Sequence, residues 1–118
     1  MKASLRGDVY LKNVEVKGNT YVYGGGEHSI HVENSRLIKV IVHKLDGGVR
    51  LAANGKTTIQ DIIVQSSTII ESLQGVVIKN TTISDKLEAN QNVLLKGDFE
   101  KVTVQAPNIS ITNSKGDN

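Results

Sequence analysis

Cysteine and tryptophan are absent from the 118-residue sequence, and proline and phenylalanine occur once each. Without cysteine the chain can form neither a disulfide framework nor a thiolate site, and cysteine usage indicates no compartment. Aromatic residues make up only 3% of the chain, which argues against an aromatic-rich core of the immunoglobulin type. We therefore expect a core of aliphatic side chains.

Long apolar runs and a surplus of one charge are lacking as well. No apolar run approaches the roughly 18 residues that a membrane-spanning helix needs, and the N-terminus has no long apolar stretch of the secretory type. The 14 basic and 12 acidic residues are spread along the chain and give a formal net charge of +2. These features argue against membrane insertion and against specific nucleic-acid binding.

β-Branched residues are what the sequence has in quantity. It contains 14 valines and 12 isoleucines, against 9 leucines and 5 alanines. Such side chains pack well on pleated surfaces and lose rotamer freedom in helices. The length fits one domain, because single cores commonly hold about 100–200 residues. The composition therefore indicates one all-β domain.

Apolar strands recur along the chain at a nearly constant period. One column of strand residues, spaced by 20, 22, 19 and 21 positions, consists of Val22, Val42, Val64, Ile83 and Val104. The residues two positions earlier share its face: Thr20, Val40, Ile62, Thr81 and Val102. A second column starts from Val9, Ile30 and Val49, with same-face partners Leu11, Val32 and Leu51.

A constant period of this length is typical of stacked coils, since hairpin-based sandwiches and barrels do not require one. One coil cannot bury its inward face alone, so successive coils stack into a continuous parallel-sheet core. The sequence predicts a right-handed parallel β-helix, a single-stranded solenoid of five to six coils of 19–22 residues. Because no C-terminal cap is recognisable, residues 1–118 are expected to form one β-helix domain or a segment of a longer solenoid.

Asparagine follows several of the strands at the same distance. Four times, two apolar residues flank a variable one and are followed two positions later by Asn. An Asn at a bend takes left-handed dihedral angles at low cost, and its amide can bond to the Asn stacked on it. We predict a ladder of turn asparagines at Asn13, Asn34, Asn80 and Asn113.

Strand alternation places a second set of side chains on the outside of the coils. One predicted outward column is apolar and contains Tyr21, Ile41 and Ile63. The predicted column beside it is polar and contains Tyr23, His43, Gln65, Ser84 and Gln105. Sugar faces can stack on the aromatic end of this face, and sugar hydroxyls can bond to its amides and imidazole. The pattern therefore predicts a site for an extended glycan.

A second candidate surface is predicted on the other strand of each coil. It consists of Tyr10, His31 and Arg50, with Lys12 and Glu33 beside them. Its charges can also be read as an ordinary solvated face.

Motifs for catalysis are missing. The acids near strand ends on adjacent coils are Asp46, Asp61, Asp98 and Glu100, whereas β-helical lyases and hydrolases need clustered carboxylates. The sequence has no phosphate-binding loop, nucleophile elbow or zinc spacing. We expect a chain that is not an enzyme and needs no cofactor.

Metal binding is left with one open alternative. Calcium bound at the turns through Asp46 or Asp98 and backbone carbonyls is compatible with the sequence. His28, His31 and His43 are not expected to share a metal, because the first two lie on opposite faces of one strand.

Five phrases of the sequence carry a family resemblance: Thr20–Gly26, Ser29–Asn34, Asp46–Leu51, Thr58–Gln65 and Gly97–Pro107. Through them the stretch from Gly7 to Ile111 resembles the right-handed β-helix modules of Gram-positive cell-surface proteins that travel with S-layer homology domains. It is also similar to carbohydrate-binding modules of β-helical type. The resemblance implies an extracellular or cell-surface location and a cell-wall polysaccharide ligand of the glucan, xylan or pectin class.

A structural role is the alternative. The C-terminal coil keeps core-like residues at Ile109 and Ile111 and has no recognisable cap. A weaker resemblance is to the bactofilins, short β-helices that polymerise end to end. On this reading the partners are a second copy of the chain or further coils of its own parent protein.

Overall fold

The computed structural model describes residues 2–4, 9–23, 28–43, 49–86, 92–105 and 110–113. These residues form strands and no helix. The odd-numbered strands, which form sheet A, are β1 (Lys2–Ser4), β3 (Glu15–Tyr23), β5 (Arg36–Val42), β7 (Thr58–Val64), β9 (Val77–Ile83) and β11 (Val102–Val104). The even-numbered strands, which form sheet B, are β2 (Val9–Lys12), β4 (His28–Glu33), β6 (Val49–Asn54), β8 (Thr68–Ser72), β10 (Asn92–Gly97) and β12 (Ser110–Asn113).

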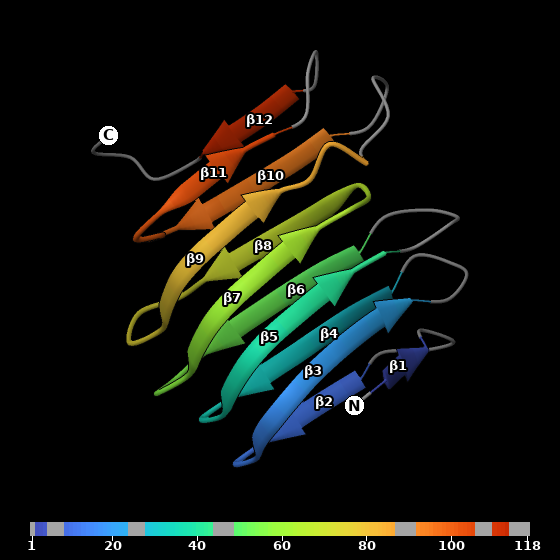
Figure 1. The fold of residues 1–118 in the computed structure, drawn as a ribbon. Coiled ribbons are helices and arrows are strands. Elements are labelled where there is room, and N and C mark those ends of the chain that lie inside the picture. The colour runs from blue at the N-terminus through green and yellow to red at the C-terminus, as the bar shows by residue number, and fades with distance from the viewer. Residues whose placement is uncertain are drawn as a thin grey trace.

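The chain alternates between the two sheets, and each strand pairs in parallel with the strand of the next coil (Figure 1). This arrangement is a parallel β-solenoid, as the period predicted. Every coil leaves its apolar face open until the next coil covers it, which is why strands of the same type recur once per coil. The right-handed sense and the number of coils stay predictions.

The predicted inward columns of sheet A are confirmed by the strand register. Val22 pairs with Val42, Val42 with Val64, and this column continues through Ile83 to Val104. The side chains of both sheets meet in one core that is almost wholly aliphatic, with Phe99 packed against it. Residues Val22, Val42, Val64 and Ile83 are fully buried there.

The predicted column of sheet B is confirmed from β2 to β4, where Val9 pairs with Ile30 and Leu11 with Val32, but is wrong from β4 to β6. Ile30 pairs with Leu51, whereas Val49 lies opposite His28. Val49, Leu51 and Ala53 all point into the core. Inward and outward residues alternate with a period of two, so Val49, Leu51 and Ala53 all fit the inward face. The alternation therefore does not detect a register shift of two residues.

The turns that lead from sheet B to sheet A share a left-handed residue. Its φ is 56° at Asn13, 48° at Asn34, 68° at Gly55, 94° at Gly75 and 105° at Gly97. The predicted turn role of Asn13 and Asn34 is thus confirmed. The backbone N–H of Lys56 donates to Oδ1 of Asn34 at 2.9 Å, so this amide joins two stacked turns.

The predicted turn role is wrong for the other two asparagines. Asn80 lies inside β9 and pairs with Asp61, and Asn113 is the last residue of β12 and pairs with Leu95. The sequence template around Asn80 belongs to a sheet A strand, which follows the turn, whereas the template around Asn13 belongs to a sheet B strand, which precedes it. Glycine supplies the left-handed residue in the later turns because it has no Cβ to clash.

A ladder of hydroxyls beside these turns was not foreseen. The N–H of Val14 donates to Oγ of Ser35 at 3.2 Å, and the N–H of Ser35 donates to Oγ1 of Thr57 at 3.3 Å. Both hydroxyl residues are buried. They satisfy backbone donors at a corner where the sheet ladders are interrupted.

Candidate functional site

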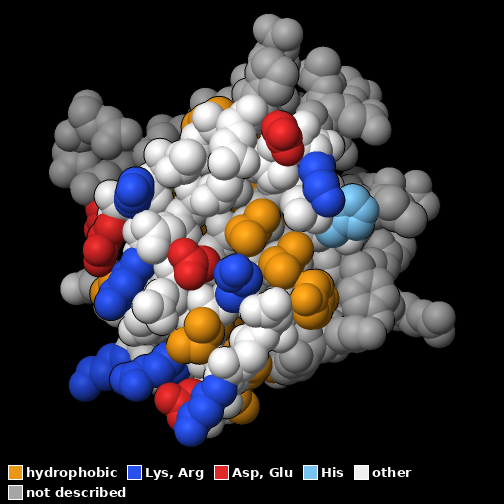
Figure 2. All heavy atoms as spheres, viewed as in Figure 1, with side chains coloured by type: hydrophobic (Ala, Val, Ile, Leu, Met, Phe, Trp, Pro, Cys, Tyr) orange, Lys and Arg blue, Asp and Glu red, His pale blue; other side chains and the backbone are white. Residues whose placement is uncertain are grey.

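The apolar outward column of sheet A has the predicted register. Tyr21 pairs with Ile41, and Ile41 pairs with Ile63, so the three side chains stand on consecutive strands of one face. Tyr21 is 40% exposed, and Ile41 and Ile63 are half-buried. Figure 2 views this face and shows hydrophobic side chains across its middle. Neighbouring strands are about 4.8 Å apart, so the column forms a continuous apolar strip along the solenoid.

The polar column next to this strip is only partly as predicted. The N–H of His43 donates to the carbonyl of Val22 at 3.0 Å, and the N–H of Gln65 donates to that of Val42 at 2.8 Å. The ladder therefore carries His43 and Gln65 on in register beyond the ends of β5 and β7. His43 is exposed and Gln65 is half-buried. The side chain of Tyr23 lies outside the described residues.

Ser84 does not belong to the exposed part of that column. It is buried, and its hydroxyl accepts the backbone N–H of Lys86 at 3.2 Å. The expectation that it points outward is wrong. The chain turns at this residue, and the buried hydroxyl accepts a backbone N–H of the turn. Gln105, at the same place on the next coil, is exposed.

A bend in the sheet A strands creates a further surface that alternation did not predict. β5, β7 and β9 each place two successive residues outward, namely Ile38–Lys39, Gln60–Asp61 and Lys79–Asn80. In β3 the register shifts between Val16 and Asn19. The strands curve at this point (Figure 1). The sequence did hold a signal for the bend, because inward residues three positions apart recur at Leu37 and Val40 and at Ile59 and Ile62.

A groove follows this bend across four strands, and we call it the bend groove. Its apolar lining comes from Leu37, Ile38 and Val77. Its charged lining comes from Glu15, Lys17, Arg36 and Lys79, with Thr58 and Gln60 as neutral polar groups. An adjoining depression at the turns shares Glu15, Arg36 and Thr58 with it and adds Lys56.

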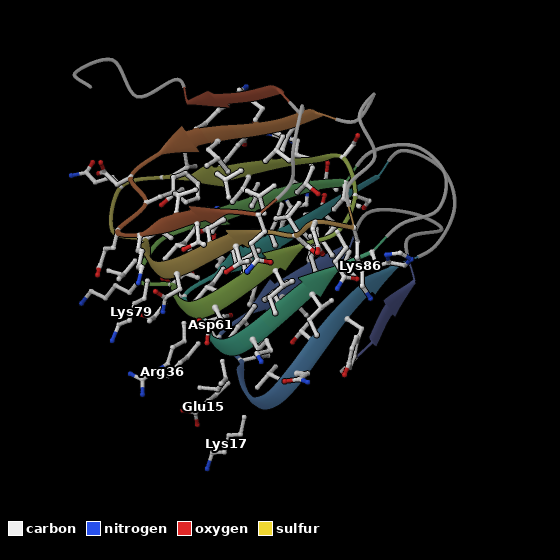
Figure 3. The ribbon with its side chains drawn as sticks, turned by 45° about the horizontal axis from the view of Figure 1, so that its top comes forward. Glu15, Lys17, Arg36, Asp61, Lys79 and Lys86 are labelled. Atoms are coloured by element: carbon white, nitrogen blue, oxygen red, sulfur yellow. The ribbon has the colours of Figure 1, made fainter. Side chains whose placement is uncertain are left out.

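The charges of the bend groove are mainly positive. Nη1 of Arg36 lies 3.7 Å from Oε2 of Glu15, and both side chains are at least half exposed. Within the described part of the chain, Lys17, Lys56 and Lys79 have no carboxylate within ion-pair distance. Figure 3 shows Glu15, Lys17, Arg36 and Lys79 at the same side of sheet A, with Lys86 at the opposite ends of the strands.

The second predicted surface, on sheet B, is brought together only in part. The rings of Tyr10 and His31 stack, with centroids 4.5 Å apart and an angle of 7° between the planes. Beside them Nζ of Lys12 lies 4.0 Å from Oε2 of Glu33. These contacts agree with the predicted column of Tyr10 and His31.

Arg50 lies in a different column of sheet B. It pairs with Ser29, while Ala52 takes the position opposite His31. The prediction is wrong because it depended on the same two-residue shift that misplaced Val49. The guanidinium instead donates two hydrogen bonds to Glu71, from Nη2 at 2.7 Å and from Nε at 3.1 Å, and Nζ of Lys96 lies 3.7 Å from the same carboxylate. The hydrogen bonds from Arg50 hold the pKa of Glu71 below its ordinary value, against the opposing effect of burial.

Groups that could hold a metal ion are not found among the described residues, where no three His, Asp or Glu side chains cluster. Asp98 is exposed just after β10. Asp46 and the side chain of His28 lie outside the described residues. Calcium at the turns therefore stays a prediction.

Comparisons with known proteins give no relative. No protein-family model, no curated protein and no solved structure matches the chain. In the part of the chain that the structure describes, no helix is long and apolar enough to cross a bilayer. The fold thus identifies the chain only as a parallel β-solenoid.

Proposed function

We propose that the outer face of sheet A binds an extended cell-wall polysaccharide, of the glucan, xylan or pectin class, without cleaving it. One observation carries the proposal: Tyr21, Ile41 and Ile63 form an in-register strip on three consecutive strands. A flat apolar strip suits the C–H faces of successive sugars, and aromatic side chains contribute most to such contacts. His43 and Gln65 stand beside the strip, where they can exchange hydrogen bonds with sugar hydroxyls.

The proposal includes an extracellular or cell-surface location, which follows from the resemblance to surface β-helix modules. It also includes the absence of catalysis. Asp61, the one acid of the candidate set within a sheet A strand, faces Lys39 on one side and Asn80 on the other in the strand register. General acid–base cleavage of a glycoside needs a second carboxylate close by.

Affinity electrophoresis tests the proposal. The chain runs through gels that contain xylan, β-glucan, pectin or no polymer, and Tyr21→Ala is compared with Tyr10→Ala, which removes an exposed tyrosine of sheet B. We expect retardation by at least one polymer, loss of it in Tyr21→Ala, and full retardation in Tyr10→Ala. Unchanged mobility in every gel would overturn the proposal, and loss only in Tyr10→Ala would move the site to sheet B.

A second candidate function is a structural segment that stacks on further coils or on a second copy. The inward column of sheet A ends, within the described residues, at Val102 and Val104, which are 37% and 50% exposed. Exposed core-type residues at the end of a solenoid favour association. Light scattering over a range of concentrations tests this candidate, which requires oligomers that weaken in Val104→Ser.

A further inference from the structure

We infer that the bend groove selects acidic polysaccharides, chains of uronate sugars, over neutral ones. The inference rests on the proposed function, because the groove lies on the same outer face of sheet A as the Tyr21 strip. The class of glycan is inferred from the charges of the groove, because Tyr21, Ile41 and Ile63 carry none.

The positive charges of the groove come from three of its four strands. Lys17 lies on β3, Arg36 on β5 and Lys79 on β9, while Lys56 precedes β7 in the adjoining depression. Successive coils are about 4.8 Å apart, which is comparable to the length of one hexose unit. Lys17 and Lys79 are three strand steps apart, or about 14 Å. A uronate chain that follows the solenoid axis can therefore place the carboxylates of different sugars beside these cations.

Of these cations, Arg36 alone has a carboxylate within ion-pair distance among the described residues. Glu15 is the one carboxylate among the described residues that line the groove, and its contact with Arg36 at 3.7 Å is a solvent-exposed ion pair, which contributes little stability. Asp61 lies outside the groove, in the column next to it, opposite Lys39. The ammonium groups of Lys17 and Lys79 can therefore meet a ligand carboxylate without breaking an ion pair between described residues.

The neutral lining favours a glycan over a polynucleotide. Ile38 and Val77 are exposed apolar groups that fit sugar C–H faces, and Gln60 can bond to hydroxyls. Single-stranded nucleic acids are held by aromatic side chains on which the bases stack. None of the residues that line the groove in the described part of the chain is aromatic.

The test compares polygalacturonate, its fully methyl-esterified form, β-glucan and polyuridylate as gel-embedded polymers, with mobility expressed relative to a polymer-free gel. Lys17→Gln/Lys79→Gln is the groove variant. Lys12→Gln/Lys86→Gln is the control for the change of charge, because it removes two positive charges outside the groove; Lys12, unlike Lys17 and Lys79, lies 4.0 Å from a carboxylate, that of Glu33. Circular dichroism confirms that both variants keep the strand content of the parent chain.

We expect polygalacturonate to bind more tightly than its ester and than β-glucan. The groove variant should bind polygalacturonate about tenfold more weakly, as two exposed ion pairs imply, while the control stays within twofold of the parent. Equal binding of neutral and acidic glycans, unchanged in the groove variant, would overturn the inference and leave the proposed function intact. Binding of polyuridylate as tight as that of polygalacturonate would also overturn it, whereas failure of every glycan to bind would contradict the proposed function itself.

Discussion

At the scale of single residues, two buried threonines of sheet A stand out. Oγ1 of Thr20 and Oγ1 of Thr81 have no hydrogen-bond partner, although both residues are buried in the inward column. An unsatisfied buried hydroxyl costs free energy that a methyl group does not. Thr20→Val should therefore raise the free energy of unfolding by about 1 kcal/mol, measured by chemical denaturation.

Thr57→Val is the matched control for that prediction. Oγ1 of Thr57 donates to the carbonyl of Asn54 at 2.7 Å and accepts the N–H of Ser35. Losing both bonds leaves buried groups unpaired, so this variant should lose about 1–3 kcal/mol. A loss of stability in Thr20→Val of the same size would show that its hydroxyl is satisfied after all.

The left-handed turn residues give a second prediction at this scale. Gly97 has a φ of 105°, and a Cβ at this position would collide with the carbonyl oxygen of Ser72 on the previous coil. Gly97→Ala should lower the free energy of unfolding by at least about 2 kcal/mol, since strain and collision add. Gly18→Ala, where a Cβ would meet no atom within 4 Å, should change stability far less in the same denaturation series. Equal effects of the two substitutions would contradict the close stacking of the turns.

At the scale of elements, Glu71 ties three neighbouring strands of sheet B together, because Arg50 comes from β6 and Lys96 from β10. The pKa of Glu71 is lowered in the folded state, so the folded state favours the carboxylate more than the unfolded state does. Its contribution to stability is complete above the ordinary pKa of 4.5 and is lost as the pH falls through the lowered folded value.

Unfolding free energies measured between pH 7 and pH 3 test this role of Glu71. The parent chain should lose more stability over the acidic part of this range than Glu71→Gln, which has no carboxylate to protonate. Glu33→Gln serves as the control, because the ion-pair partner of Glu33 among the described residues is a single lysine 4.0 Å away. If Glu71→Gln and the parent show the same pH dependence, the three-strand ion-pair network contributes nothing to stability.

Some features of the strands could be predicted from the sequence, and others could not. The inward column from Val22 to Val104 was predictable, because each coil repeats the same β-branched pair at nearly the same period. The partner of Ile30 was not, since neighbouring apolar residues two apart satisfy the same alternation. The bend groove was missed for a related reason: strict alternation allows one outward residue where Ile38 and Lys39 both point out.

At the scale of the whole molecule, the candidate site depends on how coils stack and not on any local motif. Tyr21, Ile41 and Ile63 are about twenty residues apart in sequence and become neighbours only through the sheet A register. Their alignment followed from the period alone. Arg50 was misassigned because the same reasoning in sheet B lacked a residue that fixed the register. The charge of the bend groove combines residues of three coils, which composition and local pattern do not reveal.

The central claim, that glycan binds on the outer face of sheet A, is tested most directly by amide chemical shifts. Short oligosaccharides of xylan, β-glucan and polygalacturonate are titrated into isotopically labelled protein. The account predicts shifts with at least one of them that concentrate in β3, β5 and β7, around Tyr21, Ile41 and Ile63, and spare Tyr10 and His31 on sheet B. Shifts confined to β2, β4 and β6, or no shifts with any of the three sugars, would contradict it.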